Sequence, residues 1–169
     1  MIFVTVGTHE QPFDRLIEYV DRKKGEKAIG DEIFIQTGFS NYEPVFCDWE
    51  KLVPQTRMEE LFREADIVIT HGGPASFMTP LKYGKMPIVV PRRREFSEHI
   101  NDHQVEFCRA VKERYGNIIL IEDIEELSDA VNGYEGLMKE KSAAVEGNTA
   151  RFVREFEEIA LKLIGENNV

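Results

Sequence analysis

The sequence predicts an α/β fold in which helices cover both faces of a parallel sheet, in one domain spanning 1–169. Short apolar runs alternate with segments of helical periodicity along almost the whole chain, and this alternation is typical of βαβ units with right-handed crossovers. The length of 169 residues suits one domain, and no internal repeat, low-complexity tract or long linker divides it.

The first part of the chain begins with a strand and an amphipathic helix. An apolar run predicts the strand over 2–6, and apolar residues spaced i, i+3, i+4 and i+7 predict the helix from Phe13 to Val20. Pro12 suits the first turn of this helix, and Gly25 suits its end. The elements expected next are strands over 33–37 and, more weakly, 45–47, and a helix over 55–64.

The stretch 67–104 is expected to hold the binding site. Strands over 66–70 and 87–91 each end in a polar loop, and each loop leads into a helix. In a parallel sheet both loops lie at the carboxyl edge of the strands, where ligands of open α/β sheets bind. We therefore interpret the rest of the chain as the scaffold of these two loops.

The C-terminal part continues the alternation of helix and strand. An apolar stripe after Gln104 predicts a helix that ends near Gly116, and a strand is expected over 118–121. The next helical pattern is broken or bent near Gly133 and Gly136. The last segments are a polar candidate hinge, 139–149, and an amphipathic helix, 152–164.

Composition argues against several classes of function. The net charge of −10 and the pI near 5.0 disfavour binding to nucleic-acid phosphates or anionic lipid headgroups. Cys47 and Cys108 lack metal-ligand spacing, which favours reduced thiols in a cytosolic protein. No apolar run approaches the about 20 residues that cross a bilayer, and the sequence starts with a strand instead of a signal peptide. We expect a cytoplasmic protein that reaches a membrane only through another protein.

A glycine-containing loop after the strand over 66–70 is the first candidate ligand site. Glycines let the backbone approach a ligand closely, and the following helix N-terminus offers unpaired N–H groups to a phosphate. A tight turn without a ligand explains the same pattern. The loop is neither a P-loop nor a Gly-x-Gly-x-x-Gly fingerprint. Its residues are His71, Gly72, Gly73, Pro74, Ala75 and Ser76, the last a candidate helix cap or ligand donor.

The second loop carries more polar groups than a helix start requires. Arg92, Arg93 and Arg94 form a basic cluster in an acidic protein, either as a phosphate contact or as a solvated face. Three of the four histidines lie on the two loops, but their spacing makes a metal site a weak alternative. A sugar-nucleotide pocket needs hydrogen-bond donors to the phosphates, a contact to the ribose and partners for the sugar hydroxyls, and the two loops contain side chains of all three types. The hydrogen-bonding side chains of the second loop are Glu98, His99, Asn101, Asp102, His103 and Gln104.

The loop after the first strand lies at the same edge of the predicted sheet. It contains Gly7, Thr8, His9 and Glu10. His9 or Glu10 could act as a general base or orient an acceptor, and simple solvation of a turn is an equal alternative.

Three segments, 4–8, 71–76 and 90–104, resemble the C-terminal, donor-binding domain of family-28 glycosyltransferases. The similarity covers roughly the first 125 residues. It extends to stand-alone forms of this domain, which include the catalytic subunit of bacterial exopolysaccharide and capsule β-1,4-galactosyltransferases. They also include the cytosolic subunit of the eukaryotic N-acetylglucosaminyltransferase that extends dolichol-linked sugar.

The resemblance implies one Rossmann-like half of a GT-B glycosyltransferase. A separate, membrane-anchored subunit would bind the lipid-linked acceptor, and the donor would be a UDP-sugar used with inversion. It implies no metal and no cofactor besides this substrate. Thr79 stands where longer members hold the ribose with a glutamate, and Gln104 would contact the sugar. The implied donor-binding set is Gly7, Thr8, His71, Gly72, Gly73, Pro74, Ala75, Ser76, Thr79, Arg92, Glu98, His99, Asp102, His103 and Gln104, with His9 and Glu10 as catalytic candidates.

Two other functions remain compatible with these residues. Thr79 in place of a glutamate suits a non-catalytic regulatory subunit of the same complex. The arginines suit a self-contained α/β enzyme that acts on a small phosphorylated substrate. The identity of the sugar (galactose, glucose or N-acetylglucosamine) is open. The C-terminal helix, about 150–165, either docks a partner subunit or packs on its own sheet.

Overall fold

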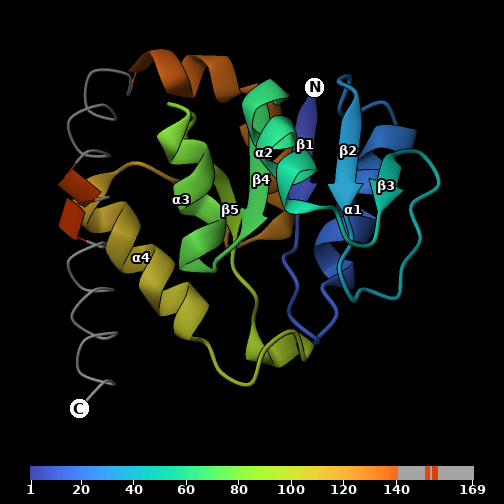
Figure 1. The fold of residues 1–169 in the computed structure, drawn as a ribbon, viewed down its shortest axis with the longest axis horizontal. Helices are drawn as coiled ribbons and strands as arrows, with labels where there is room; N and C mark the ends of the chain where they lie inside the picture. The colour runs from blue at the N-terminus through green and yellow to red at the C-terminus, as the bar shows by residue number, and fades with distance from the viewer. Residues whose placement is uncertain (141–150, 153, 156–169) are drawn as a thin grey trace.

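The computed structural model describes residues 1–140, 151–152 and 154–155. Its centre is a parallel six-stranded sheet with the order β3-β2-β1-β4-β5-β6, which confirms the predicted Rossmann-like fold (Figure 1). The strands are β1 (Ile2–Thr5), β2 (Ile33–Gln36), β3 (Asp48–Glu50), β4 (Ile67–His71), β5 (Ile88–Val90) and β6 (Ile119–Leu120).

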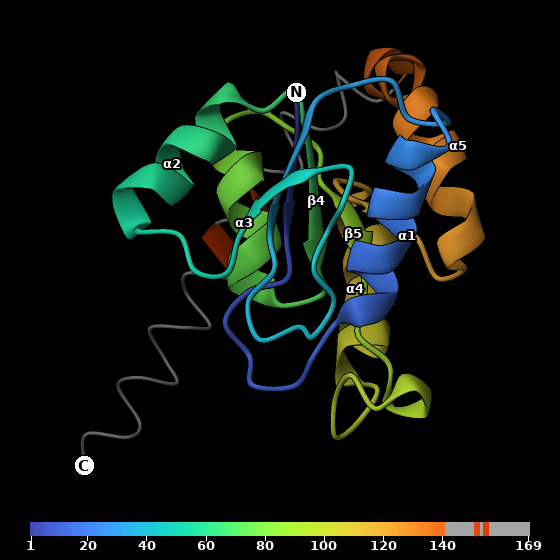
Figure 2. The same cartoon turned by 90° about the vertical axis from the view of Figure 1, so that its right-hand side faces the viewer.

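Helices cover both faces of the sheet, as Figure 2 shows from the side. One face packs against α1 (Asp14–Gly25) and α5 (Leu127–Asn132), and the other against α2 (Gln55–Glu64), α3 (Pro74–Lys82) and α4 (His103–Tyr115). Side chains of β1 alternate between the two cores: Ile2 and Val4 pack with α1, and Phe3 packs with α2. Two short 3₁₀ helices span Arg94–Phe96 and Ile124–Glu126, and residues 134–140 are also helical.

Most predicted elements are confirmed within one or two residues, and the helix over 55–64 is confirmed at both ends. The helix of the first part starts at Asp14, so Pro12 precedes it, and Gly25 is its last residue. The chain reverses at Lys27, which has a φ of 59°. A turn at Gly133 interrupts the helical pattern as expected, whereas Gly136 lies within a helical run.

The predicted strand over 45–47 is wrong, and a buried carboxylate explains why. Asp21 is fully buried on α1, and its two carboxylate oxygens accept hydrogen bonds from the backbone N–H groups of all three residues at 2.8–3.0 Å. Tyr42 Oη donates a fourth bond to the same carboxylate at 2.8 Å. These N–H groups therefore point at α1 instead of a neighbouring strand, and β3 begins afterwards at Asp48.

Most of the predicted hinge over 139–149 and of the helix over 152–164 lies outside the described residues. Where the structure describes that helix, it packs on its own domain. The ring of Phe152 is 3% exposed and lies 6.0 Å from the ring of Phe77 on α3 and 4.9 Å from that of Tyr115 on α4. Glu155 pairs with Arg114 of α4 at 2.7 Å.

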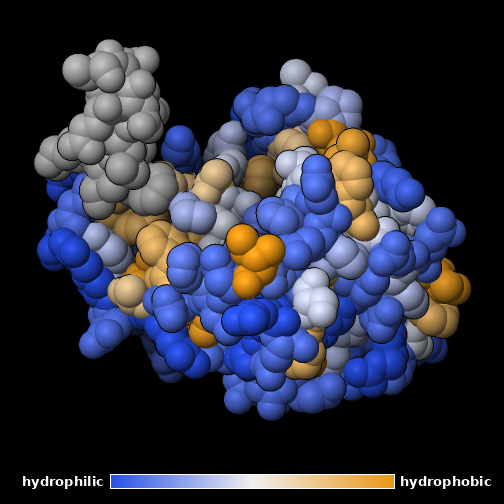
Figure 3. Space-filling view, turned by 90° about the horizontal axis from the view of Figure 1, so that it is seen from below, coloured by the Kyte–Doolittle hydropathy of each residue, from blue (hydrophilic) through white to orange (hydrophobic). Residues whose placement is uncertain are grey.

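The strands point downward in Figure 1, so Figure 3, viewed from below, shows the face at their carboxyl ends. Hydrophilic residues cover most of this face, and hydrophobic residues form separate patches on it. The loops after β1, β4 and β5 all lie at this edge because the three strands are parallel neighbours. The fold thus brings together the three loops that the sequence singled out.

Candidate functional site

A cavity of about 690 Å³ lies at the carboxyl edge, where β1, β2 and β4 end. The loop after β1 and the first turns of α3 form part of its wall, and α2 with the segment before it forms the rest. The structure therefore joins two of the predicted loops in one site. Predicted residues that line it are Gly7, Thr8, His9, His71, Ala75, Ser76 and Thr79; the other lining residues are Thr5, Gln36, Val53, Gln55, Met58, Glu59 and Phe62.

The N-terminus of α3 forms one end of the cavity. Pro74 occupies the first helical position, where its missing N–H is not needed. The backbone N–H groups of Gly73 and Ala75 have no hydrogen-bond partner among the residues that the structure describes. Unpaired N–H groups at the positive end of a helix dipole suit a phosphate. Ser76 does not cap this helix; its Oγ lies 3.2 Å from Nε2 of His71.

The His71 side chain fills the space between two glycines of the site. A Cβ added at Gly7 would lie 2.5 Å from its Cε1, and one added at Gly73 would lie 2.6 Å from its Nε2. Burial, and then the charge of Arg92, lower the pKa of His71 to about 4. The imidazole is therefore neutral at physiological pH, although a hydrogen bond to the backbone of Thr5 partly opposes the lowering of its pKa. His71 can contribute a hydrogen bond to a ligand but not a positive charge.

Gln104 connects the glycine loop to the β5–α4 loop. Its Oε1 accepts hydrogen bonds from the backbone N–H groups of Gly72 and Arg92, both at 3.1 Å. These two donors fix the orientation of the amide, so its NH₂ group is the part that remains for a ligand. Gln104 is not among the residues that line the cavity, and its predicted contact with a sugar stays a prediction.

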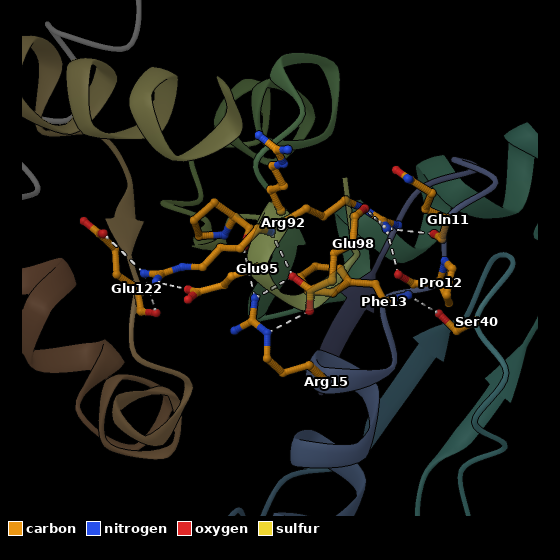
Figure 4. A network of polar contacts seen from close by, with 12 residues as sticks. Gln11, Pro12, Phe13, Arg15, Ser40, Arg92, Glu95, Glu98 and Glu122 are labelled. Atoms are coloured by element: carbon orange, nitrogen blue, oxygen red, sulfur yellow. Dashed lines mark hydrogen bonds and ion pairs between the residues drawn. The ribbon is translucent and has the colours of Figure 1, made fainter. Parts of the chain in front are cut away.

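The arginine cluster separates into three environments. Arg92 is buried, and its guanidinium donates to backbone oxygens (Figure 4). Arg93 pairs with Glu95 at 2.9 Å and with Glu122 at 3.4 Å. Arg94 is exposed, and its backbone N–H donates to Asp102 Oδ1 at 2.9 Å. Neither Arg92 nor Arg93 lines the cavity, so their guanidinium groups support the protein around it.

The remaining polar residues of the β5–α4 loop mostly bond to one another. Glu98 is 3% exposed and forms a two-bonded ion pair with Arg15 of α1, at 2.8 and 2.9 Å. Asn101 Oδ1 accepts from the backbone N–H of His103 at 3.2 Å and lies 3.0 Å from Nδ1 of His99. The His99 ring of this loop lies beside a cavity residue, with its centroid 5.2 Å from that of His9.

His9 and Glu10, the two catalytic candidates, are placed differently. His9 lines the cavity, and its Nδ1 accepts a hydrogen bond from the backbone N–H of Gln11 at 3.2 Å. Because Nδ1 accepts, the neutral ring carries its proton on Nε2. Burial, then the charges of Arg92 and His99, lower the pKa of His9. Glu10 is exposed and does not line the cavity.

The sequence did not predict that residues of β2 and α2 form one side of the cavity. Gln36 is buried at the end of β2; its Oε1 accepts from Thr5 Oγ1 at 2.6 Å and its Nε2 donates to Gly7 O at 3.0 Å. It thereby holds the loop after β1. The sequence did contain a signal for Gln36: it lies at the end of an apolar strand, at the edge of the sheet where ligands bind. Met58 and Phe62 have the spacing of an apolar helix stripe within 55–64, and both also line the cavity.

Two further findings concern metals and membranes. In the described ranges, no group of three or more His, Cys, Asp or Glu side chains is arranged to hold a metal ion. Within the same ranges, no helix combines the length and the apolar character needed to span a bilayer.

Comparison with known proteins gives a family match and structural neighbours. The chain matches the glycosyltransferase family 28 C-terminal domain over residues 1–161. It is similar in structure to the glycosyltransferase SnogD from Streptomyces nogalater, at 18% identity and a TM-score of 0.55, covering 88% of this chain and 39% of that one. It is also similar to MurG from Acinetobacter baumannii, at 15% identity and a TM-score of 0.55, covering 92% and 49%.

A third neighbour, the glycotransferase of kitacinnamycin, is 19% identical with a TM-score of 0.54, covering 93% of this chain and 42% of that one. At such identities these likenesses are of fold alone. The chain spans less than half the length of each of the three neighbours. No curated protein matches the chain.

Proposed function

The chain belongs to glycosyltransferase family 28 through the C-terminal domain of that family, and on this premise we propose that it is a glycosyltransferase, the donor-binding, catalytic subunit of a two-subunit inverting enzyme. The donor is a UDP-hexose that carries galactose, glucose or N-acetylglucosamine. The acceptor is a lipid-linked saccharide of exopolysaccharide or capsule biosynthesis. A membrane-anchored partner binds this acceptor and recruits the chain to the inner face of the membrane.

The cavity at the ends of β1 and β4 is the observation that carries this proposal. Its wall contains Ala75, whose backbone N–H at the start of α3 is unpaired among the described residues, and the Ser76 hydroxyl; both suit the oxygens of a diphosphate. Its volume of about 690 Å³ lies in the range of small-molecule sites. Apolar side chains of α2, Met58 and Phe62, supply a surface for a flat base on the opposite side.

In the proposed reaction, the acceptor hydroxyl oxygen forms a bond to the anomeric carbon as the bond from that carbon to the UDP oxygen breaks. UDP leaves with the electron pair, and the hydroxyl proton passes to a base. Backbone N–H groups at the start of α3 stabilise the charge that develops on the diphosphate. Nδ1 of His9 already accepts from Gln11, which favours Glu10 or a group of the partner as the base.

The shape of the chain supports a partner at the carboxyl edge. The chain spans less than half the length of each structural neighbour, and in the proposed two-subunit enzyme a separate chain supplies the other half. Four large apolar side chains that follow the carboxyl ends of β2, β3 and β5 are 50–74% exposed and are available for contact with such a partner. These are Phe39, Leu52, Phe96 and Ile100.

One observation favours a non-catalytic subunit as the second candidate. The Thr79 hydroxyl donates to Ala75 O at 3.2 Å, so its proton is not available to a ribose hydroxyl. A self-contained enzyme with an arginine phosphate clamp has less support, because Arg92 and Arg93 bond to protein oxygens.

Calorimetric titration of the whole chain with UDP and the three UDP-hexoses, with and without magnesium, tests the proposal. We expect UDP to bind independently of magnesium. Gly73→Ala should weaken binding by about tenfold or more, because its Cβ would lie 2.6 Å from Nε2 of His71 and would displace the ring or the glycine loop. Gly30→Ala is the matched control, since a Cβ there meets nothing within 4 Å.

The sugar is identified by the UDP-hexose whose affinity falls in Gln104→Ala while UDP affinity is retained. Sugar transfer on addition of a co-expressed membrane partner supports a catalytic subunit, and donor binding without transfer supports the regulatory alternative. Lack of UDP binding both alone and with the partner would refute the donor site.

A further inference from the structure

Arg92 is 1% exposed and is the largest fully buried side chain in the described part of the chain. Its guanidinium lies within hydrogen-bond distance of four backbone carbonyl oxygens (Figure 4). Nη1 donates to Gln11 O at 2.8 Å and to Pro12 O and Glu98 O at 3.2 Å, and Nη2 donates to Val6 O at 2.9 Å. The group also stacks over the ring of Phe13 at 4.8 Å.

These acceptors belong to the two loops that meet at the site. Val6 and Gln11 flank the segment 7–10, which carries the cavity residues Gly7, Thr8 and His9. Glu98 belongs to the β5–α4 loop, and its carboxylate is held by Arg15 and by the backbone N–H of Arg93 at 3.0 Å. One side chain therefore fixes both ends of the segment 7–10 against the neighbouring loop.

The charge of Arg92 is only partly offset. Among the described residues, no carboxylate forms an ion pair with its guanidinium; the Glu98 carboxylate raises the pKa of Arg92 through its charge but is itself paired with Arg15. Burial lowers the pKa of Arg92 to about 10, which leaves it charged at neutral pH. The side chains that line the cavity include no lysine or arginine, and the one carboxylate is that of Glu59.

The positive charge of Arg92 acts on two side chains that line the cavity. It is a cause of the lowered pKa of both His71 and His9, which lie at the ends of β4 and β1. A potential that disfavours imidazolium at these positions favours an anion there. The low dielectric of the buried site lets the effect act without a direct contact.

We propose that Arg92 is a positioning residue of the donor site, which fixes the segment 7–10 and supplies positive potential to the bound diphosphate without touching it. The nature of the anion rests on the proposed function. The position of the loop and the potential at the histidines do not, so the two can be tested separately.

NMR titration of the histidines in the full chain, without ligand, is the first test. The variants are Arg92→Met, which removes the charge, and Arg92→Lys, which keeps it, with Arg93→Met as control. We expect the pKa values of His9 and His71 to rise in Arg92→Met and to stay near wild type in Arg92→Lys and the control. Unchanged values in Arg92→Met, or an equal rise in Arg92→Lys, would overturn the electrostatic role.

Amide hydrogen exchange of the segment 7–10 tests the positioning role. Lysine cannot reproduce the four-fold contact, so Arg92→Lys should accelerate exchange there by about tenfold while the exchange of β4 is retained. Wild-type protection of 7–10 in Arg92→Lys would overturn this role. If Arg92→Met fails to fold, Arg92→Lys still decides it, and raised histidine pKa values in Arg92→Lys would still overturn the charge role.

UDP titration then connects the inference to the site. Loss of the charge in Arg92→Met should weaken UDP binding by about tenfold, while the Arg93→Met control binds like wild type. Wild-type UDP affinity in Arg92→Met would overturn the proposal. If the wild-type chain itself fails to bind UDP, the proposed function is wrong, and the ligand-free measurements still judge the role of Arg92.

Discussion

The imidazole of His71 and the backbone of Gly7 are in such close contact that a Cβ at Gly7 would lie 2.5 Å from Cε1 of the ring. Gly7 also has a φ of 74°, which L side chains rarely adopt. The first loop of the site and the end of β4 thus depend on each other for their shape.

We predict that Gly7→Ala destabilises the protein beyond the effect of backbone strain. Gly84→Ala is the matched control, because Gly84 has a φ of 71° and a Cβ there meets nothing within 4 Å. Strain alone should cost about 1–2 kcal/mol in both variants, and displacement of His71 should add about 1–3 kcal/mol in Gly7→Ala. Urea unfolding of the two variants measures the difference, and equal losses would show that the ring yields freely.

The neutrality of His71 predicts a pH dependence of stability. Its folded pKa of about 4 lies below the ordinary value of 6.5, so the unfolded chain binds more protons between these values. The contribution is fully present above about pH 6.5 and is lost as the pH falls toward 4, by up to about 3 kcal/mol. Urea unfolding from pH 7 to 4 should show this slope in wild type and a shallower one in His71→Gln. An equal slope in both would contradict it.

A second, more acidic window is expected from Asp21. Burial by itself raises the pKa of this carboxyl, but the hydrogen bonds from Val45, Phe46, Tyr42 and Cys47 outweigh it and the pKa is lowered. Its contribution is present above the ordinary value of 3.8 and is lost as the pH falls below it. At pH 7, Asp21→Asn should cost about 2–4 kcal/mol in chemical unfolding, because its amide faces N–H donors. Asp31→Asn, at an exposed position, should cost little. A similar small loss in both variants would argue against the capping role of Asp21.

Both cysteines should resist thiol reagents in the folded protein. Burial raises the pKa of Cys47 and of Cys108 to about 12, so only ~10⁻⁴ of either thiol is ionised at pH 8. Cys108 also lies behind the glycine loop, with Sγ 3.8 Å from Gly72 O. Reaction with a coloured disulfide reagent should be slow in buffer and rapid in denaturant, at two thiols per chain. Rapid native labelling of either thiol would show that its surroundings open.

The parts of the fold that local pattern determines were predictable from the sequence. Periodicity placed the helix over 55–64 and the strands of the sheet, and the parallel arrangement placed three loops at one edge. The segment 45–47 could not be placed, because the carboxylate that draws its N–H groups away lies more than twenty residues earlier in the chain, on α1.

The roles of individual polar side chains depend on packing that the sequence does not contain. Arg92, Arg93 and Arg94 are consecutive and chemically identical, yet one is buried, one is paired and one is exposed. Met58 and Phe62 fit a helical stripe, and only the tertiary arrangement shows that they also face the cavity. Interior contacts of this kind are set by residues far apart in the chain, such as Arg15 and Glu98.

The two outermost strands bear on how this chain can meet other chains. β3 has three residues and β6 has two, and both exposed ends of β3, Asp48 and Glu50, are acidic. Short, charged border strands present little unpaired backbone, which disfavours aggregation by sheet extension. Any lasting association of this domain is therefore expected to use helices and loops. The surface that limits aggregation of the free chain is then separate from the surface that binds another chain.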